Sequence, residues 1–462
     1  MRNRTKITLA VFLSVIASWE ITGQDIPVTL DGEKEYISLE QAIRIGTADS
    51  PSLKIKEITI QEKERGLKEE ITRKFPDLTL QAGAQRNFII GVTPIPAKMM
   101  NPEAADGEIY LARFGTDYSG IAGINLQFDI FNPERYGNVA RQKLQLALSE
   151  VERQDQKELL ISNICLDYAA AAIALEQLDL CEADTLNSRK YLDYVLAGKS
   201  EGRFSEDECL LARQNMGISR ALLLQAESIC INSKCRLLKD LGIDVKDVDP
   251  ETYVLEDTID ELVSMCRNSS PGDFPMAECF SRGDAARMKD KLELELKKLE
   301  IKCDLAGFFP TISMNGYYGS NYFNDRFNPF KSDRWYGNAF LGLKINYPLT
   351  GLSGQSFKMK KNRLAYKRTE LEQEEARQKR NLDINSYNTE VLNYGKEIDI
   401  RRSNLEFALK RLGIAKRQEE EGGMRPDQMN DSIYKMRECR VEYLQCLYNY
   451  FTALVNRRIS EI

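Results

Sequence analysis

The side chains that could carry out chemistry in this chain are restricted, because the sequence contains no histidine. This excludes imidazole general bases, the Ser-His-Asp triad, and zinc or haem held by histidine. Lysine, glutamate, cysteine and tyrosine remain as catalytic candidates, but the carboxylates are spread along charged stretches with helical periodicity and form no constellation with catalytic spacing. We therefore expect no enzymatic activity, no metal site and no bound cofactor.

The ten cysteines show neither a Cys-x-x-Cys pair nor a zinc-like cluster. Most of them lie in stretches with helical periodicity, where a small buried side chain is the simplest explanation. Cys266 and Cys279 differ, because they lie in a segment that contains Gly, Pro and Ser, and they could form a disulfide in an oxidising compartment.

The amino terminus has the layout of an export signal, with Arg2, Arg4 and Lys6 before an apolar run from Ile7 to Trp19. That run is too short to span a bilayer as a mature helix, which predicts a signal peptide over residues 1–23. The alternative is an uncleaved membrane anchor, since the residues before Gln24 match a cleavage site poorly. The remaining sequence has no comparable apolar run, so a mature protein that spans a membrane must do so as a β-barrel.

Formal charge argues against a nucleic-acid partner. The chain has 64 basic and 70 acidic side chains, a net charge of -6, and no long basic run that could follow a phosphate backbone.

The placement of proline predicts two long helical hairpins, because a helix interior tolerates proline poorly. Residues 138–197 contain neither Gly nor Pro and carry apolar side chains at helical spacing, which predicts a rod of roughly 90 Å. A second, highly charged rod is expected from Gln355 to Glu421. A glycine-containing turn follows each rod, and a returning helix follows each turn. The hairpins are expected over residues 134–241 and 354–462.

The two hairpins belong to a tandem repeat. The offset that superposes Gly202 on Gly423 also places Leu241 over Ile462, the last residue. Phe-Pro pairs at Phe75 and Phe309 each close a shorter helix and open a segment with strand-like alternation. These correspondences predict a first repeat over residues 24–241, a linker or equatorial segment over 242–283 and a second repeat over 284–462.

Each repeat also contains two segments of alternating polarity, of the length that a tilted transmembrane strand needs. The strands are expected at about residues 77–90 and 119–131, and at about 310–323 and 335–349. In the second of them we expect one apolar face to contact lipid, formed by Ala122, Ile124, Leu126, Phe128 and Ile130. Four strands cannot close a barrel around a useful pore, so several chains must contribute.

A soluble, half-buried sheet would show the same alternation. Two features favour the membrane instead: long polar loops between the strands of one repeat, and aromatic side chains near the strand ends, as in an interfacial girdle. The aromatic residues are Phe88, Tyr110, Phe114, Tyr118, Tyr322, Phe323, Phe327, Phe330, Trp335 and Tyr336.

The ordered set of these features resembles the TolC family of outer-membrane efflux proteins, over nearly the whole mature chain. The segment from Ser38 to Ile43, followed by Ser50-Pro51, is similar to that family's first helix, and Phe75-Pro76-Asp77-Leu78 to its entry into the first strand. The resemblance implies a fold that is mainly α with transmembrane β. It also implies a homotrimer, with a 12-stranded barrel in the outer membrane and a helical tunnel that crosses the periplasm.

The resemblance further implies a passive exit duct of a tripartite efflux or type I secretion system. Its partners would be a periplasmic adaptor, an inner-membrane pump and outer-membrane lipid. A coiled-coil scaffold on the surface, or a periplasmic adaptor, is the alternative, although neither needs two matched sets of strands and two hairpins.

The same resemblance places the adaptor-contacting tip at the two turns, which include Gly198, Gly202, Arg203, Gly422, Gly423 and Arg425. Arg425 resembles the family's latch arginine and Glu208 its acidic partner, and charge-assisted hydrogen bonds would suit such a latch. A solvated surface charge is the alternative for Arg425. The family's constriction aspartates fall here on Met429 and Ser432, so Asp427 and Asp431 are weaker substitutes on one helical face.

Overall fold

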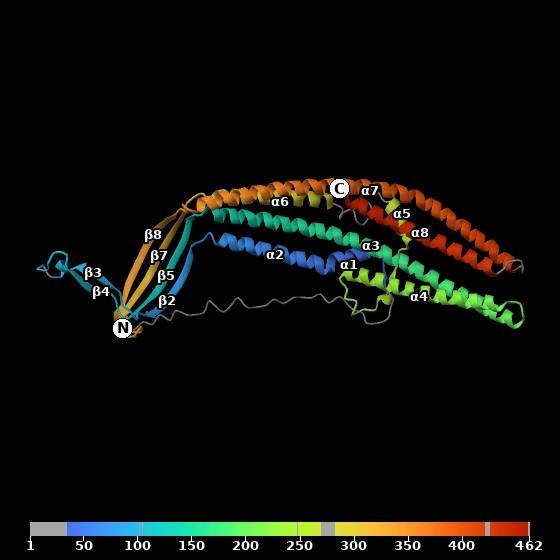
Figure 1. Ribbon diagram of the computed structural model, residues 1–462, viewed down its shortest axis with the longest axis horizontal. Coiled ribbons are helices and arrows are strands. Elements are labelled where there is room, and N and C mark those ends of the chain that lie inside the picture. The colour runs from blue at the N-terminus through green and yellow to red at the C-terminus, as the bar shows by residue number, and fades with distance from the viewer. Residues whose placement is uncertain are drawn as a thin grey trace, which may run out of the picture.

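The computed structural model describes residues 35–100, 102–103, 105–246, 248–268, 282–420 and 426–460. Over these residues the molecule is elongated, with a four-stranded sheet towards one end and long helices running from it to the other (Figure 1). The expected signal peptide, Cys279, and Gly422, Gly423 and Arg425 of the second turn lie outside the described residues.

The sheet is antiparallel, with the strand order β2-β5-β7-β8. Its strands overlap the four ranges expected from the alternation, although β2 and β8 end a few residues earlier. They are β2 (Asp77–Arg86), β5 (Tyr118–Phe131), β7 (Thr311–Asn324) and β8 (Trp335–Asn346). The register shifts between Asp129 and Phe131, where β5 gives way to a helix that begins at Pro133. Within the described residues, β2 and β8 are unpaired on their outer sides, so the sheet is open.

Six long helices continue from the sheet. α2 (Pro51–Thr72) and α6 (Arg282–Ala306) lead into β2 and β7, whereas α3 (Pro133–Ser200) and α7 (Gly351–Glu420) follow β5 and β8. α4 (Glu206–Leu241) returns along α3, and α8 (Pro426–Ser460) returns along α7. α3 has 68 residues and α7 has 70, which gives rods of about 100 Å. Two helical hairpins therefore extend away from the sheet.

The helices follow a lateral order that matches the order of the strands. Nearer the sheet, α3 packs between α2 and α6, and α6 packs against α7. Nearer the far end, α3 packs between α4 and α8, and α8 packs against α7. One lateral edge of the chain is thus β8 with α7, and the other is β2 with α2 and α4.

A belt of short elements surrounds the middle of α3. It contains β1 (Glu35–Ile37), α1 (Leu39–Asp49), β6 (Tyr253–Leu255) and α5 (Ile259–Asn268), and β1 pairs in parallel with β6. The fully buried Tyr168 of α3 donates its hydroxyl to the carbonyl of Ile37 at 2.9 Å, and Asp257 accepts from the amide of Leu39 at 2.8 Å. The segment expected as a linker or equatorial element thus contributes β6 and α5 to the principal apolar core.

α3 is also apolar enough over one 18-residue window to cross a membrane, and it is the one helix of this kind among the described residues. Because 67% of that window is buried inside the protein, the window serves as core. Three single turns of 3-10 helix complete the fold, at Ala97–Met99, Pro250–Thr252 and Ser332–Arg334.

A β-hairpin that was not expected from the sequence interrupts the connection between β2 and β5. β3 (Val92–Pro96) and β4 (Ile109–Arg113) form a separate two-stranded sheet that extends beyond the end of the main sheet (Figure 1). We call residues 87–117 the arm. The expectation of a simple polar loop is wrong here, because a paired ladder with exposed apolar side chains lies within it.

Candidate functional site

The main sheet has one largely apolar and one largely polar face, because most cross-strand partners in the observed register match in polarity. Ile124 pairs with Leu80 and Tyr318, and Leu126 pairs with Leu78 and Gly316. The apolar face consists of Leu78, Leu80, Ala82, Ala122, Ile124, Leu126, Phe128, Ile312, Met314, Gly316, Tyr318, Ala339, Leu341, Leu343 and Ile345. Many of its large side chains are exposed, with Leu80 at 83%. Four of the five residues expected to contact lipid, all but Ile130, lie on this continuous face.

The opposite face is polar and includes two glycines that bring β5 and β7 close together. Its residues include Thr79, Gln81, Gln85, Asn125, Gln127, Asp129, Ser313, Asn315, Asn321, Asn338, Lys344 and Asn346. Gly123 pairs with Gly319, and a Cβ at either position would meet the other glycine's Cα at less than 3.0 Å. A sheet with one apolar and one polar face is suited to form a wall between lipid and an aqueous lumen.

Aromatic side chains gather at the end of the sheet that is remote from the long helices. Tyr118 lies 5.5 Å from Phe327 between ring centroids, and Phe323 lies 6.3 Å from Tyr336. Tyr322 differs from the rest of the expected girdle because it is almost fully buried. Its hydroxyl donates to the carbonyl of Arg326 and accepts from the amide of Asn328, so it holds its own loop together.

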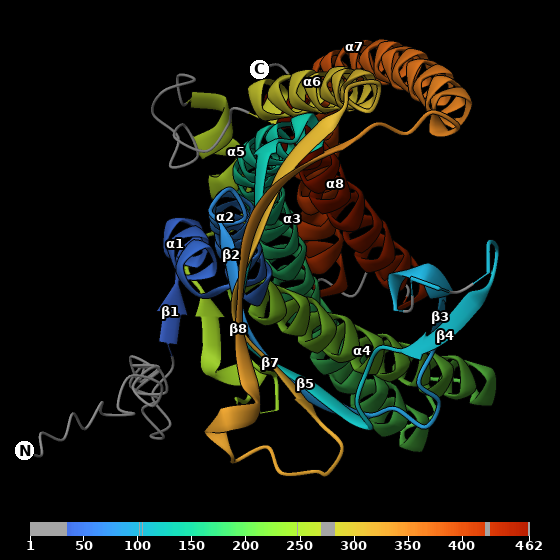
Figure 2. The same ribbon diagram turned by 90° about the vertical axis from the view of Figure 1, so that its left-hand side faces the viewer.

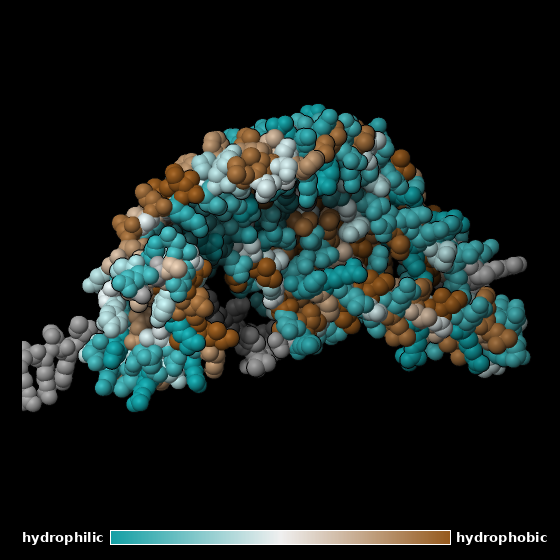
Figure 3. Space-filling view, turned by 60° about the vertical axis from the view of Figure 1, so that its left-hand side comes forward, coloured by the Kyte–Doolittle hydropathy of each residue, from teal (hydrophilic) through white to brown (hydrophobic). Residues whose placement is uncertain are grey.

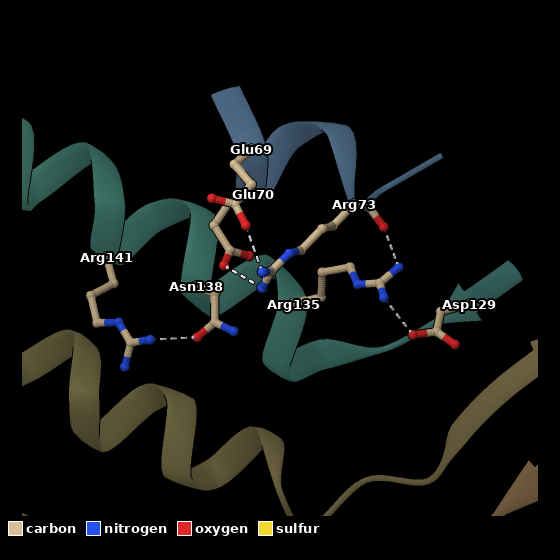
Figure 4. A network of polar contacts seen from close by, with 7 residues as sticks. All are labelled: Glu69, Glu70, Arg73, Asp129, Arg135, Asn138 and Arg141. Atoms are coloured by element: carbon tan, nitrogen blue, oxygen red, sulfur yellow. Dashed lines mark hydrogen bonds and ion pairs between the residues drawn. The ribbon is translucent and has the colours of Figure 1, made fainter. Parts of the chain in front are cut away.

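A polar network fixes the junction between sheet and helices (Figure 4). Arg135, in the first turn of α3, forms a 3.0 Å ion pair with Asp129 of β5 and also donates to the carbonyl of Arg73 at the end of α2. The guanidinium of Arg73 in turn contacts Glu69 at 2.7 Å and Glu70 at 3.0 Å. The network joins α2, β5 and α3 where the chain changes from strand to helix.

The two lateral edges of the chain carry many exposed apolar side chains. On α7 most of them recur at intervals that place them on one side of the helix, and on α4 they extend along the returning helix. They are Ile55, Ile58 and Ile71 on α2, Leu210, Leu211, Ile218, Leu222, Leu224, Ile229 and Ile231 on α4, and Phe357, Leu364, Leu371, Leu382, Leu392, Ile400, Phe407, Leu409 and Ile414 on α7. Figure 3 shows apolar patches where the sheet passes into the helices and a mainly hydrophilic surface over much of the helical part.

The first turn of the far end is held by contacts within its own hairpin. Gly202 has a φ of 75°, which glycine adopts readily, and a Cβ at Gly198 would lie 2.4 Å from the ring of Phe204. Arg203 is paired with Glu201. Glu208 completes a capping box with Ser205, accepting from the Ser205 amide at 2.6 Å. One oxygen of the predicted latch carboxylate is therefore already used to cap α4.

The second turn is described only from its flanks. Met429 is buried against Leu412 and Ala415 of α7, and the buried Ser432 donates to the carbonyl of Gln428 at 3.0 Å. The side chain of Asp431 is exposed, whereas that of Asp427 lies outside the described residues. Gly422, Gly423 and Arg425 also lie outside them, so the pairing of Arg425 with Glu208 stays a prediction.

A buried ion pair between the two hairpins was not anticipated. Asp184 of α3 is 7% exposed and is paired with Arg437 of α8. Burial raises the pKa of the Asp184 carboxyl, and the adjacent guanidinium opposes that increase. The only sequence signal was an acidic residue within the apolar repeat of a long helix. The pair links the first repeat to the second between the core belt and the tip.

The cysteines are arranged as packing residues. Cys266 is buried, and burial raises the pKa of its thiol to about 12, so the thiol stays protonated and unreactive at neutral pH. Its proposed disulfide partner, Cys279, is outside the described residues. Within the part of the chain that the structure describes, no three His, Cys, Asp or Glu side chains gather as a metal site would require.

No family model matches the sequence, and no curated protein matches it. Solved structures do match. They include the CmeC outer membrane channel of Campylobacter jejuni, with a TM-score of 0.73 and 14% identity over 91% of this chain and 85% of that one. The outer membrane protein VceC of Vibrio cholerae has a TM-score of 0.67 and 14% identity, over 91% of this chain and 95% of that one.

The open state of the MtrE outer membrane channel of Neisseria gonorrhoeae has a TM-score of 0.65 and 14% identity, over 91% of this chain and 88% of that one. The chain has the TolC-type channel fold. The expected fold class, mainly α with a strand layer and two helical hairpins, is thereby confirmed.

Proposed function

We propose that this chain is the outer-membrane channel component of a tripartite efflux or type I secretion system. Three copies would pool their strands into one 12-stranded barrel, and their helices would continue it as a tunnel through the periplasm. The duct would be passive, because a channel wall of this kind supplies no energy, and transport would depend on an inner-membrane pump reached through a periplasmic adaptor.

The observation that carries this proposal is the agreement between the edges of the sheet and the edges of the helical layer. β8 and α7 form one edge, and β2, α2 and α4 form the other. The two edges are different surfaces, so copies associate head to tail and a rotation closes them into a ring. Closure would give hydrogen-bond partners to the unpaired backbone groups of β2 and β8, and it would cover the exposed apolar side chains of α4 and α7.

The outer membrane is the location that best supports such a ring. An apolar outer face and a polar inner face satisfy the requirements of lipid and of an aqueous pore at once. Comparable structures are described as outer membrane channels. Separation of inner and outer membranes on a density gradient tests this, with the protein expected in the outer-membrane fraction. Recovery in the soluble periplasmic fraction would contradict it.

Channel activity is tested by reconstituting detergent-purified protein into planar bilayers. We expect discrete conductance steps from a trimeric preparation. Trimers that insert into the bilayer and never conduct would contradict the proposed channel function. Monomers in detergent would contradict the proposed trimer.

We further propose that the two turns form the adaptor-contacting tip and that Arg425 contributes to its closure. The local pairing of Arg203 with Glu201 leaves that arginine a less suitable latch. Charge reversal by Arg425→Glu should raise single-channel conductance without affecting trimer assembly, because it removes a charge-assisted hydrogen bond that holds the tip closed. Arg203→Glu is the matched control at the first turn. Equal conductance in Arg425→Glu and the unaltered protein would show that Arg425 is a solvated surface charge.

A further inference from the structure

The arm is built as an independent unit at the outer end of the chain. Its two strands pair from Val92 with Arg113 to Pro96 with Ile109, in a ladder separate from the main sheet. At the base of the arm, the backbone amide of Asn87 donates to the carbonyl of Asp117 at 2.7 Å. The arm therefore continues past the main sheet as a paired ladder.

One face of the arm is mostly apolar and uncovered. The register places Val92, Ile109 and Leu111 on the same face, where they are 49%, 62% and 63% exposed, and the exposed Arg113 lies at its base opposite Val92. Further exposed apolar side chains lie at its tip and base: Met99, Met100, Phe88, Ile89 and Phe114. Each Å² of apolar surface left in water costs about 25 cal/mol, so a cluster of this kind marks a contact surface.

The free edge of β3 is unsuited to strand addition. The amide of Ala97 donates to the carbonyl of Glu108, so the backbone nitrogen of Ala97 points towards β4. Successive nitrogens along a strand alternate in direction, and those of Pro94 and Pro96 therefore point away from β4. Proline has no N–H to offer to a further strand. At the β3 edge a partner must therefore contact the arm through side chains.

The position of the arm indicates which partner is available. Figure 2 views the molecule from the sheet end and shows β3 and β4 on the side towards which the arc of helices opens, whereas β1 and α1 lie on the opposite side. Lipid would contact the outward, convex side. The arm instead lies towards the concave side, which in a ring would face the central axis and the arms of the other copies.

We propose that the arms of three copies pack against one another through the face formed by Val92, Ile109 and Leu111, and so cover the extracellular mouth of the channel. This inference rests on the trimeric channel proposed above. The occupant of the apolar face is a second copy of the same arm. The mouth would then be narrowed by side-chain contacts that can separate without breaking a strand ladder.

Crosslinking of Leu111→Cys with a short bismaleimide tests the contact in the detergent-solubilised full-length chain. We expect covalent dimers on a denaturing gel, with two controls that should not crosslink: the unaltered protein, whose described cysteines are buried or half-buried, and Phe330→Cys, an exposed position in the β7–β8 loop. Size measurement on the same sample separates the two proposals. Trimers without arm crosslinks overturn the cover, whereas a monomeric sample overturns the trimer.

A second measurement does not depend on crosslinker geometry. The double variant Ile109→Asp/Leu111→Asp should raise single-channel conductance, because six like charges around the axis would push the arms apart, whereas Phe330→Asp should leave it unchanged. Intact trimers of the double variant with unaltered conductance would overturn the proposed cover.

Discussion

Leu126→Arg is the most direct mutational test of the orientation of the sheet. Leu126 lies near the middle of β5, between Leu78 of β2 and Gly316 of β7 on the apolar face, and its side chain covers the space above Gly316. An arginine facing lipid near the bilayer midplane costs about 2–4 kcal/mol. That cost corresponds to a decrease of about 30-fold to about 700-fold in the folding equilibrium constant.

The adjacent Gln127 provides the matched control. Its side chain lies on the polar face, where the proposed lumen would keep an arginine in water, so Gln127→Arg should cost less than about 1 kcal/mol. Both variants add the same side chain to the same strand, one position apart. They differ only in the face that receives the charge.

The assay is reversible unfolding in urea from lipid vesicles, followed by tryptophan fluorescence and by the heat-dependent mobility of the folded form on gels. We expect a large loss of stability for Leu126→Arg and a small one for Gln127→Arg. Equal losses would refute a sheet with one face in lipid, and a larger loss for Gln127→Arg would reverse the assignment of the faces.

Two further predictions concern the helical part. Arg437→Met should cost about 3–5 kcal/mol at neutral pH, because it leaves Asp184 buried without its partner. Burial raises the pKa of Asp184, so the loss of unfolding free energy should shrink as the pH falls through that raised pKa and the carboxyl becomes neutral. Denaturation at two pH values measures this, and a loss of stability that does not depend on pH would contradict it. Gly198→Val should destabilise the first turn by about 1–3 kcal/mol, because the new Cβ would overlap the ring of Phe204. Limited proteolysis should then cut faster at the turn, and adding Phe204→Ala should reverse the effect if the overlap is the cause.

The strands and rods were predictable because they depend on local periodicity. Alternation along residues 119–131 specifies which side chains share a face, and the observed register extends the apolar face from β5 to Leu78 and Leu80 of β2 and to Met314 and Tyr318 of β7. The long proline-free stretches similarly predict rods that the structure contains as α3 and α7.

Features that depend on contacts between distant segments were not predictable in this way. The pair of Asp184 and Arg437 joins helices from different repeats, and an acidic residue within an apolar repeat does not by itself indicate its partner. The parallel pairing of β1 with β6 involves only three residues in each strand, too few for periodicity to reveal. The arm was not predictable from periodicity, because β3 and β4 have only five residues each and β3 contains Pro94 and Pro96, which are tolerated there on a free edge.

The mass of the purified protein in detergent, determined by light scattering with the detergent contribution subtracted, tests the central claim most directly. A particle of three chains, which precipitates when the detergent is removed, is the result expected if three open sheets close into one wall in lipid. A single chain that stays dispersed in plain buffer would contradict both the ring and its lipid-facing surface.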